Sequence, residues 1–237
     1  MAMLISMINE DIRLQIRSYF YAATLFMLSV ICLVILVIPV SPIPPKFTAL
    51  LIFSDSAVMG LAFVGALVLM EKGAGTLSAL SVTPMPGWVY VSSKVITFTS
   101  LGVFSGVLVA SLAMRGEIDI PLLFSALIAC NMFAVLLGFA LITRAPSVNA
   151  FLAKLLVGSL VLALPLTVYF NIIPAVFGGV LKFIPSYAML LTVEAGLSPA
   201  PIAAETIIAA FYLIAWILGG WVWALREHDT QLVTGGL

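Results

Sequence analysis

The sequence predicts an all-α integral membrane protein with six transmembrane helices, and three observations support this prediction. The chain has 237 residues, of which 63% are hydrophobic and only 8% charged, whereas soluble proteins carry about 25% charged residues. Its apolar residues fall into long runs of about 20, the length that crosses a bilayer as a helix. Prolines and polar residues separate these runs. We therefore expect one membrane domain over residues 1–237 with the lipid bilayer as its solvent.

Residues 1–19 are expected to form an interfacial helix on the cytoplasmic leaflet. Apolar residues recur at helical spacing from Leu4 to Ile16, while Glu10, Arg13 and Arg17 take the other side. The alternative is an extension of the first span that frays into water.

The apolar runs place six spans in order along the chain, at about 20–40, 49–70, 95–114, 121–143, 150–169 and 202–225. Prolines after the first run end that span and stiffen the outer loop that follows. Residues 171–201 are broken by prolines and glycines into pieces that are too short to cross a bilayer. We expect this segment to be re-entrant, entering the outer leaflet and turning back, with its backbone satisfied by protein or water.

Basic residues predict the orientation of the chain. With both termini inside, the cytoplasmic side carries Arg13, Arg17, Lys72, Lys94, Arg144, Lys154 and Arg226, and the outer side carries only Lys46, Arg115 and Lys182. Because Lys and Arg favour cytoplasmic loops, we expect both termini in the cytoplasm and the chain in the cell membrane.

The cytoplasmic loop of residues 71–94 differs in character from the rest of the chain. It opens with a charge pair and a Gly-Ala-Gly, offers Thr76 as the N-cap of one or two helical turns, and stops these turns at Pro84. Leu77 and Leu80 lie on one face of this short helix. Residue types alone fit an ordinary loop between spans equally well.

An ordered set of residues in this loop resembles the signature of exporter-type (type-two) ABC transporter permeases. The matching residues are Glu71-Lys72, Gly75-Thr76-Leu77, Leu80, Thr83-Pro84 and Lys94. The hydropathy layout of the whole chain is similar to that family as well. The short length and the closing Gly-Gly-Leu look most like the small fluoroquinolone-export permeases of actinobacteria.

The resemblance implies that the short helix couples the permease to a separate ABC ATPase, which would hold ATP and Mg. Leu77 and Leu80 would be apolar anchors, and Glu71 and Lys72 a polar bridge to span two. It also implies a second permease chain, identical or related, and export of a lipophilic drug or another amphipathic small molecule. The coupling residues implied are Glu71, Lys72, Gly75, Thr76, Leu77, Leu80, Thr83 and Pro84.

The sequence argues against an enzyme. It has no Gly-x-x-x-x-Gly-Lys-Ser/Thr phosphate loop. Its single histidine, His228, cannot supply a His-Glu-x-x-His metal site or a Ser-His-Asp triad. The zero formal net charge argues against a nucleic-acid partner. We expect a transport subunit with no catalytic residue, cofactor or metal of its own.

Asp55 and Glu205 are the candidates for a translocation path. Asp55 lies about six residues into the second span, where a carboxylate is costly unless it faces a cavity or a partner. Alternatively, the span begins later and Asp55 is hydrated at the outer boundary. Glu205 has the same ambiguity near the outer start of the last span. These acids carry the alternative function, an ion- or proton-coupled carrier or channel, and a non-transporting scaffold is a third possibility.

Overall fold

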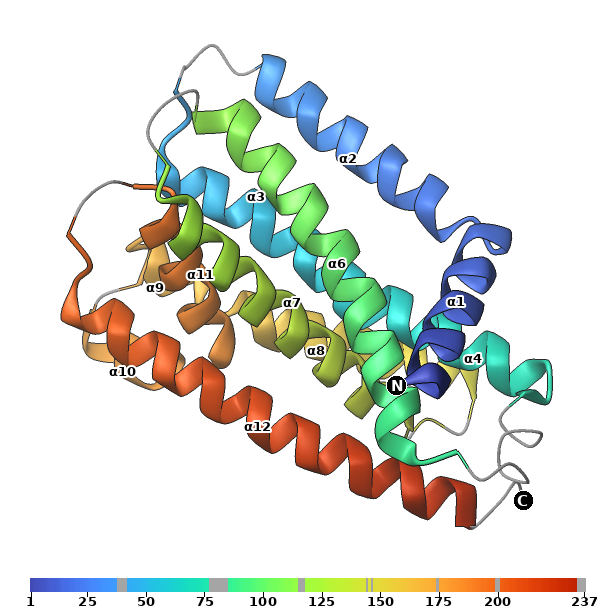
Figure 1. Ribbon diagram of the computed structural model, residues 1–237. Helices are drawn as coiled ribbons and strands as arrows, with labels where there is room; N and C mark the ends of the chain where they lie inside the picture. The colour runs from blue at the N-terminus through green and yellow to red at the C-terminus, as the bar shows by residue number, and fades with distance from the viewer. Residues whose placement is uncertain are drawn as a thin grey trace.

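The computed structural model describes residues 1–37, 42–76, 85–114, 118–143, 145, 147–173, 175–198 and 201–233. Every regular element in these ranges is a helix, which confirms the all-α class (Figure 1). Six helical stretches in the described ranges are long and apolar enough to cross a membrane, namely Phe20–Val37, Pro45–Gly73, Gly87–Met114, Ile120–Thr143, Val148–Tyr169 and Ala204–Glu227. The chain therefore has the architecture of a multi-pass membrane protein.

The N-terminal helix α1 (Ala2–Arg17) is separate from the first span, α2 (Phe20–Val37). Tyr19 adopts a positive φ of 62° between them, so the chain changes direction there. Figure 1 shows α1 crossing one end of the bundle while α2 runs along it. The predicted separate helix is thus present, and its place at the membrane surface stays a prediction.

The second span is one helical stretch built from α3 (Pro45–Ala57), a π-helical segment η1 (Val58–Phe63) and α4 (Val64–Gly73). It begins four residues before the predicted start because Pro45 can occupy the first turn of a helix. The π segment lies against helix α7 (Ile120–Thr143). A Cβ on Gly60 would overlap the backbone of Ala134, so glycine permits this close approach.

The third span, α6 (Gly87–Met114), begins eight residues earlier than the hydropathy predicts. Ser93 and Lys94 lie inside the helix and are fully buried, because neighbouring helices supply their polar partners. The fourth span, α7, packs against α6, η1, α11 and α12 and forms the centre of the bundle.

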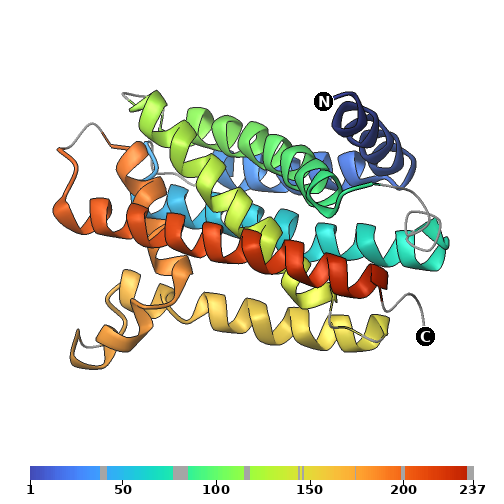
Figure 2. The same cartoon turned by 60° about the horizontal axis from the view of Figure 1, so that its bottom comes forward.

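The fifth span consists of α8 (Val148–Ala163) and a short α9 (Leu166–Tyr169), which are separated at Pro165. Two further short helices follow, α10 (Ala175–Leu181) and α11 (Pro185–Gly196), before the last span, α12 (Ala204–Val233). Figure 2 shows α10 at the end of the bundle away from α1. Neither short helix can span a bilayer, and their re-entrant placement stays a prediction.

Buried apolar side chains form two clusters along the bundle. One gathers around α3, α6, α7 and α11. The other surrounds the end of the bundle where α1 crosses, and it includes Phe20, Tyr90, Phe98 and Phe139. The second cluster encloses the polar site described next.

Candidate functional site

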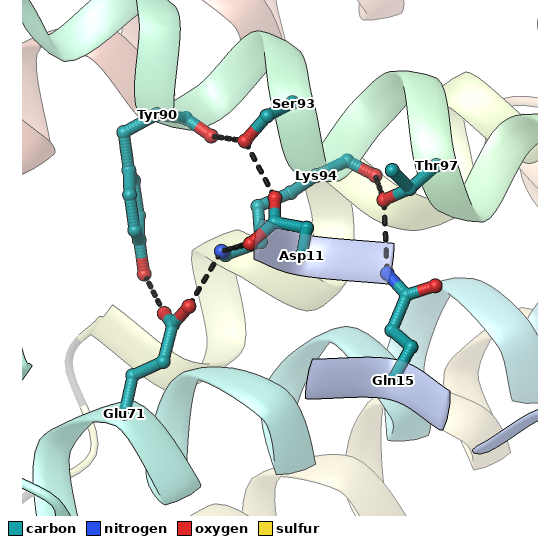
Figure 3. A network of polar contacts seen from close by, with 7 residues as sticks. All are labelled: Asp11, Gln15, Glu71, Tyr90, Ser93, Lys94 and Thr97. Atoms are coloured by element: carbon teal, nitrogen blue, oxygen red, sulfur yellow. Dashed lines mark hydrogen bonds and ion pairs between the residues drawn. The ribbon is translucent and has the colours of Figure 1, made fainter. Parts of the chain in front are cut away.

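Lys94 is the centre of a buried ion cluster that joins three helices (Figure 3). Its Nζ lies 2.6 Å from Asp11 Oδ1 of α1 and 2.7 Å from Glu71 Oε1 of α4. The exposed fractions of the three side chains are only 0%, 2% and 3% respectively. The same Nζ lies 4.4 Å from the centre of the Tyr90 ring, whose face attracts a cation. A single ammonium group therefore connects α1, α4 and α6.

The second oxygen of each carboxylate also has a donor from α6. The Tyr90 hydroxyl donates to Glu71 Oε2 at 2.5 Å, and the Ser93 hydroxyl donates to Asp11 Oδ2 at 2.6 Å. Residues three and four apart lie on the same face of a helix, so Tyr90, Ser93 and Lys94 all face the two acids. Hydrogen bonds to ionised groups are among the strongest in proteins, and here they fix both carboxylates in place.

A further hydrogen bond sets the register of α1 on α6. Gln15 Nε2 donates to Thr97 Oγ1 at 2.9 Å, one helical turn beyond Asp11 and Ser93 on the respective helices. Gln15 is fully buried, and its Oε1 has no partner among the described residues. Asp11 and Gln15 thus face the bundle, while Glu10, Arg13 and Arg17 of the predicted polar side are exposed, as are Ile5 and Ile16.

The cluster lies on both sides of the loop predicted to couple to the ATPase. Glu71 precedes Leu77 by six residues, and Tyr90 follows Pro84 by six. Gly75 has a left-handed φ of 70°, and its N–H donates to the Lys72 carbonyl at 3.1 Å, so it ends α4 as a glycine commonly ends a helix. Thr76 is helical and exposed.

Four of the predicted coupling residues lie outside the described residues, namely Leu77, Leu80, Thr83 and Pro84. The coupling helix itself therefore stays a prediction. Of the predicted polar bridge, Glu71 is buried against Lys94, whereas Lys72 is exposed and forms no ion pair within the described part of the chain. The sequence grouped Glu71 with its neighbour, but its partner lies 23 residues away.

Sequence reasoning missed five members of the cluster: Asp11, Gln15, Tyr90, Ser93 and Thr97. One feature of the sequence could have indicated the cluster. Lys94 carries a charge close to an apolar run, and such a charge needs an acidic partner. Asp11 and Gln15 are four residues apart and lie on one side of α1, between apolar neighbours such as Met7 and Leu14.

The structure gives the two candidate path acids different surroundings. Asp55 is 1% exposed inside α3, and its Oδ2 is hydrogen-bonded to the Ser105 hydroxyl of α6; it is not hydrated at the end of a span. Glu205 has a 56% exposed side chain and accepts from Lys182 Nζ at 3.0 Å and from the Tyr187 hydroxyl at 3.3 Å. The hydrogen bond to Glu205 raises the pKa of Lys182. Their roles in a path stay predictions.

Apolar grooves lie beside α7, and the following two have the larger volumes among those in the described part of the chain. One, of about 470 Å³, lies between α7 and α12 beside Phe133 and Trp216. The other, of about 620 Å³, lies between α6 and α7 beside Phe104 and Phe124. Both are lined almost entirely by apolar side chains, so they suit lipid tails, a lipophilic molecule or another helix. Within the described residues, no three His, Cys, Asp or Glu side chains come together to hold a metal ion.

Comparison with known proteins finds relatives of this chain. Two curated proteins, from two strains of Mycobacterium tuberculosis, are each 28% identical to it over 204 residues. The alignment covers 86% of this chain and 84% of theirs, and both are named fluoroquinolones export permease protein. No protein-family model and no solved structure matches the chain. The chain is therefore related to these two export permeases, as its resemblance to the small fluoroquinolone-export permeases of actinobacteria predicted.

Proposed function

We propose that this chain is the permease subunit of an ATP-driven exporter that moves a lipophilic drug or another amphipathic small molecule out of the cell. The names of its relatives support export, and its six apolar helices support a membrane path. A separate ABC ATPase would bind ATP and Mg, because the sequence lacks a phosphate loop. The chain would lie in the cell membrane with both termini in the cytoplasm. This orientation places most of its Lys and Arg residues on the cytoplasmic side, where such residues are favoured.

The observation that carries this proposal is the ion cluster on both sides of the 77–84 loop. A loop that receives a push from an ATPase needs a stiff connection to the spans that line the path. Lys94 provides one, because it holds the end of α4 to the start of α6 and also holds α1. A displacement of the loop would then move these three helices together rather than stretch a flexible connection.

The translocation path would form between two permease chains. A single six-span chain is half of what the resembled family needs, so an identical or related chain would complete it. The apolar grooves beside α7 offer surfaces for lipophilic cargo or for packing of the second chain. In this arrangement the permease does no chemistry on the substrate.

Co-purification tests the ATPase partnership. The chain would be co-expressed with an ABC ATPase from the same genome that carries the affinity tag. We expect capture of the wild type and loss of capture when Leu77→Asp and Leu80→Asp are combined, because charge cannot enter an apolar docking groove. The control combines Leu77→Met with Leu80→Met, which conserves volume and apolarity and should be captured. Failure to capture the wild type, or equal capture of the aspartate variant, would contradict the proposal.

A further inference from the structure

Asp55 is a carboxyl group buried within the bundle without a basic partner among the described residues. Its helix α3 packs against α2, η1, α6, α7 and α11. Within the described ranges, no hydrogen bond or ion pair joins Asp55 to a titratable group of these elements, and its one hydrogen-bond partner is Ser105. The titratable groups on these elements are Tyr21, Cys32, Tyr90, Lys94, Cys130, Tyr187 and Glu194.

The contacts of Ser105 indicate where the proton of this site lies. Ser105 Oγ is within hydrogen-bond distance of Asp55 Oδ2 and also lies 3.2 Å from the Gly102 carbonyl. A hydroxyl group has one hydrogen to donate, so it cannot donate to both oxygens. If Asp55 is protonated, its O–H donates to Ser105 Oγ, and Ser105 is free to donate to Gly102. Both contacts are then hydrogen bonds.

Among the described residues, Ser105 is the only group that is hydrogen-bonded to the Asp55 carboxyl. Asp55 Oδ1 has no partner in the described structure, and neither do the Ser56 and Thr99 hydroxyls or Asn131 Oδ1 on α7. Asn131 packs on Gly102, where a Cβ would overlap its side-chain amide, and its Nδ2 donates to the Leu127 carbonyl at 2.8 Å. A buried ionised carboxylate needs pairing or several donors, whereas a neutral carboxyl leaves only a carbonyl oxygen unsatisfied.

We propose that Asp55 is a proton-binding site, which is occupied in this conformation and closed to water. The ligand is a proton rather than a metal ion, because the carboxyl group is 1% exposed and no three His, Cys, Asp or Glu side chains of the described residues come together around it. The proton can leave only when α3 and α6 separate, so its release would report a change in the packing of spans two and three. The inference goes beyond the proposed function and concerns the permease chain alone, so it does not depend on an ATPase partner.

Isotope-edited infrared spectroscopy of the purified full-length chain at neutral pH tests this proposal. The sequence has only four aspartates, Asp11, Asp55, Asp119 and Asp229, so carbon-13 labelling of aspartate carboxyls gives a simple spectrum. We expect a label-sensitive C=O band of a protonated carboxyl that disappears in Asp55→Asn. The band should persist in Asp119→Asn, a control in an exposed loop position.

A second variant keeps the test decisive if Asp55→Asn does not fold. Ser105→Ala removes the acceptor of the carboxyl hydrogen bond, and we expect the band to move to higher frequency. The absence of a protonated aspartate band in the wild type would overturn the proposal. A band that survives Asp55→Asn, or that does not move in Ser105→Ala, would also overturn it, because the proton would then belong to another aspartate or have another partner.

The pH dependence of stability gives an independent readout. A carboxyl that is protonated in the native state and ionised in the unfolded state makes the native state bind more protons, so stability falls as pH rises above about 4. We expect the apparent melting temperature of the wild type to fall with pH more steeply than that of Asp55→Asn. Identical slopes would contradict a native-state proton on Asp55.

Discussion

Lys94 is the residue whose replacement most sharply tests the ion cluster. Lys94→Met keeps much of the side-chain volume but leaves Asp11 and Glu71 buried without their counter-ion. Removing one partner of a buried ion pair costs about 3–5 kcal/mol. We expect a loss of stability of that size, measured as a large fall in the thermal unfolding midpoint of the purified chain.

The chain contains a matched control for this substitution. Lys182 pairs with Glu205, but the two side chains are 45% and 56% exposed, and exposed pairs contribute about 0–1 kcal/mol. Lys182→Met should therefore change the midpoint little. Combining Lys94→Met with Asp11→Asn and Glu71→Gln should recover part of the loss, because no unpaired charge remains. Equal effects of the two lysine variants would show that the cluster does not form as described.

A substitution at Gly75 tests where the helix of the second span ends. Its φ of 70° is left-handed, and no atom of the described residues lies within 4 Å of a Cβ placed on it. Gly75→Ala would therefore be strained by its backbone alone, and we expect a loss of about 1 kcal/mol.

Gly73→Ala is the paired control for that substitution. This glycine ends α4 in equally open space, without a positive φ, so alanine there should be neutral or slightly stabilising. Chemical or thermal unfolding of both variants would measure the difference. A destabilised Gly73→Ala beside an unaffected Gly75→Ala would refute the assigned helix end.

At the scale of elements, the second span depends on its π segment fitting against α7. A Cβ on Gly60 would overlap the Ala134 backbone, and a Cβ on Gly138 would overlap the Gly60 carbonyl. Interiors resist added volume, at a typical cost of about 1–3 kcal/mol. We expect Gly60→Val to lose at least that much stability and to reduce the monodisperse fraction in gel filtration.

The control for the π segment lies on the last span. A Cβ added to Gly219 on α12 would meet no atom of the described residues within 4 Å, so Gly219→Ala should elute as the wild type does. If Gly60→Val is as well behaved as Gly219→Ala, the close contact between η1 and α7 is not present in the folded protein.

The spans could be predicted from the sequence because each one is a long apolar run, which can be recognised from its own residues without knowledge of the tertiary structure. The start of α6 was placed too late, since Ser93 and Lys94 look unsuited to a buried helix until Asp11 and Glu71 are brought to them. Those partners are 82, 83 and 23 residues away. Hydropathy contains no information on such pairings, so the cluster could not be predicted in full.

The burial of Asp55 is a second feature that hydropathy alone could not predict. The sequence left open whether it was hydrated at the end of a span, because element boundaries are uncertain by a few residues. The helix starts at Pro45, which places Asp55 ten residues inside it, about 15 Å along the axis. Its hydrogen bond to Ser105 on α6 follows from tertiary packing and not from any local pattern.

At the scale of the whole molecule, the ion cluster and Asp55 are carried by the same two spans. Span two holds Asp55 and Glu71, and span three holds Lys94 and Ser105. The cluster and the Asp55–Ser105 contact are eleven residues apart along α6, about 16 Å at 1.5 Å per residue. A movement that starts at the 77–84 loop and passes through the cluster would therefore reach Asp55 along continuous helices.

ATP-dependent transport into inside-out vesicles would test directly whether this chain is part of an ATP-driven exporter. Vesicles would contain this chain with the proposed ABC ATPase partner, and uptake of a fluorescent fluoroquinolone would be compared with vesicles that lack either chain. We predict uptake only when both chains and hydrolysable ATP are present, with no uptake from a proton gradient alone. Uptake driven by a proton gradient without the ATPase would contradict the exporter account and would favour an ion-coupled carrier.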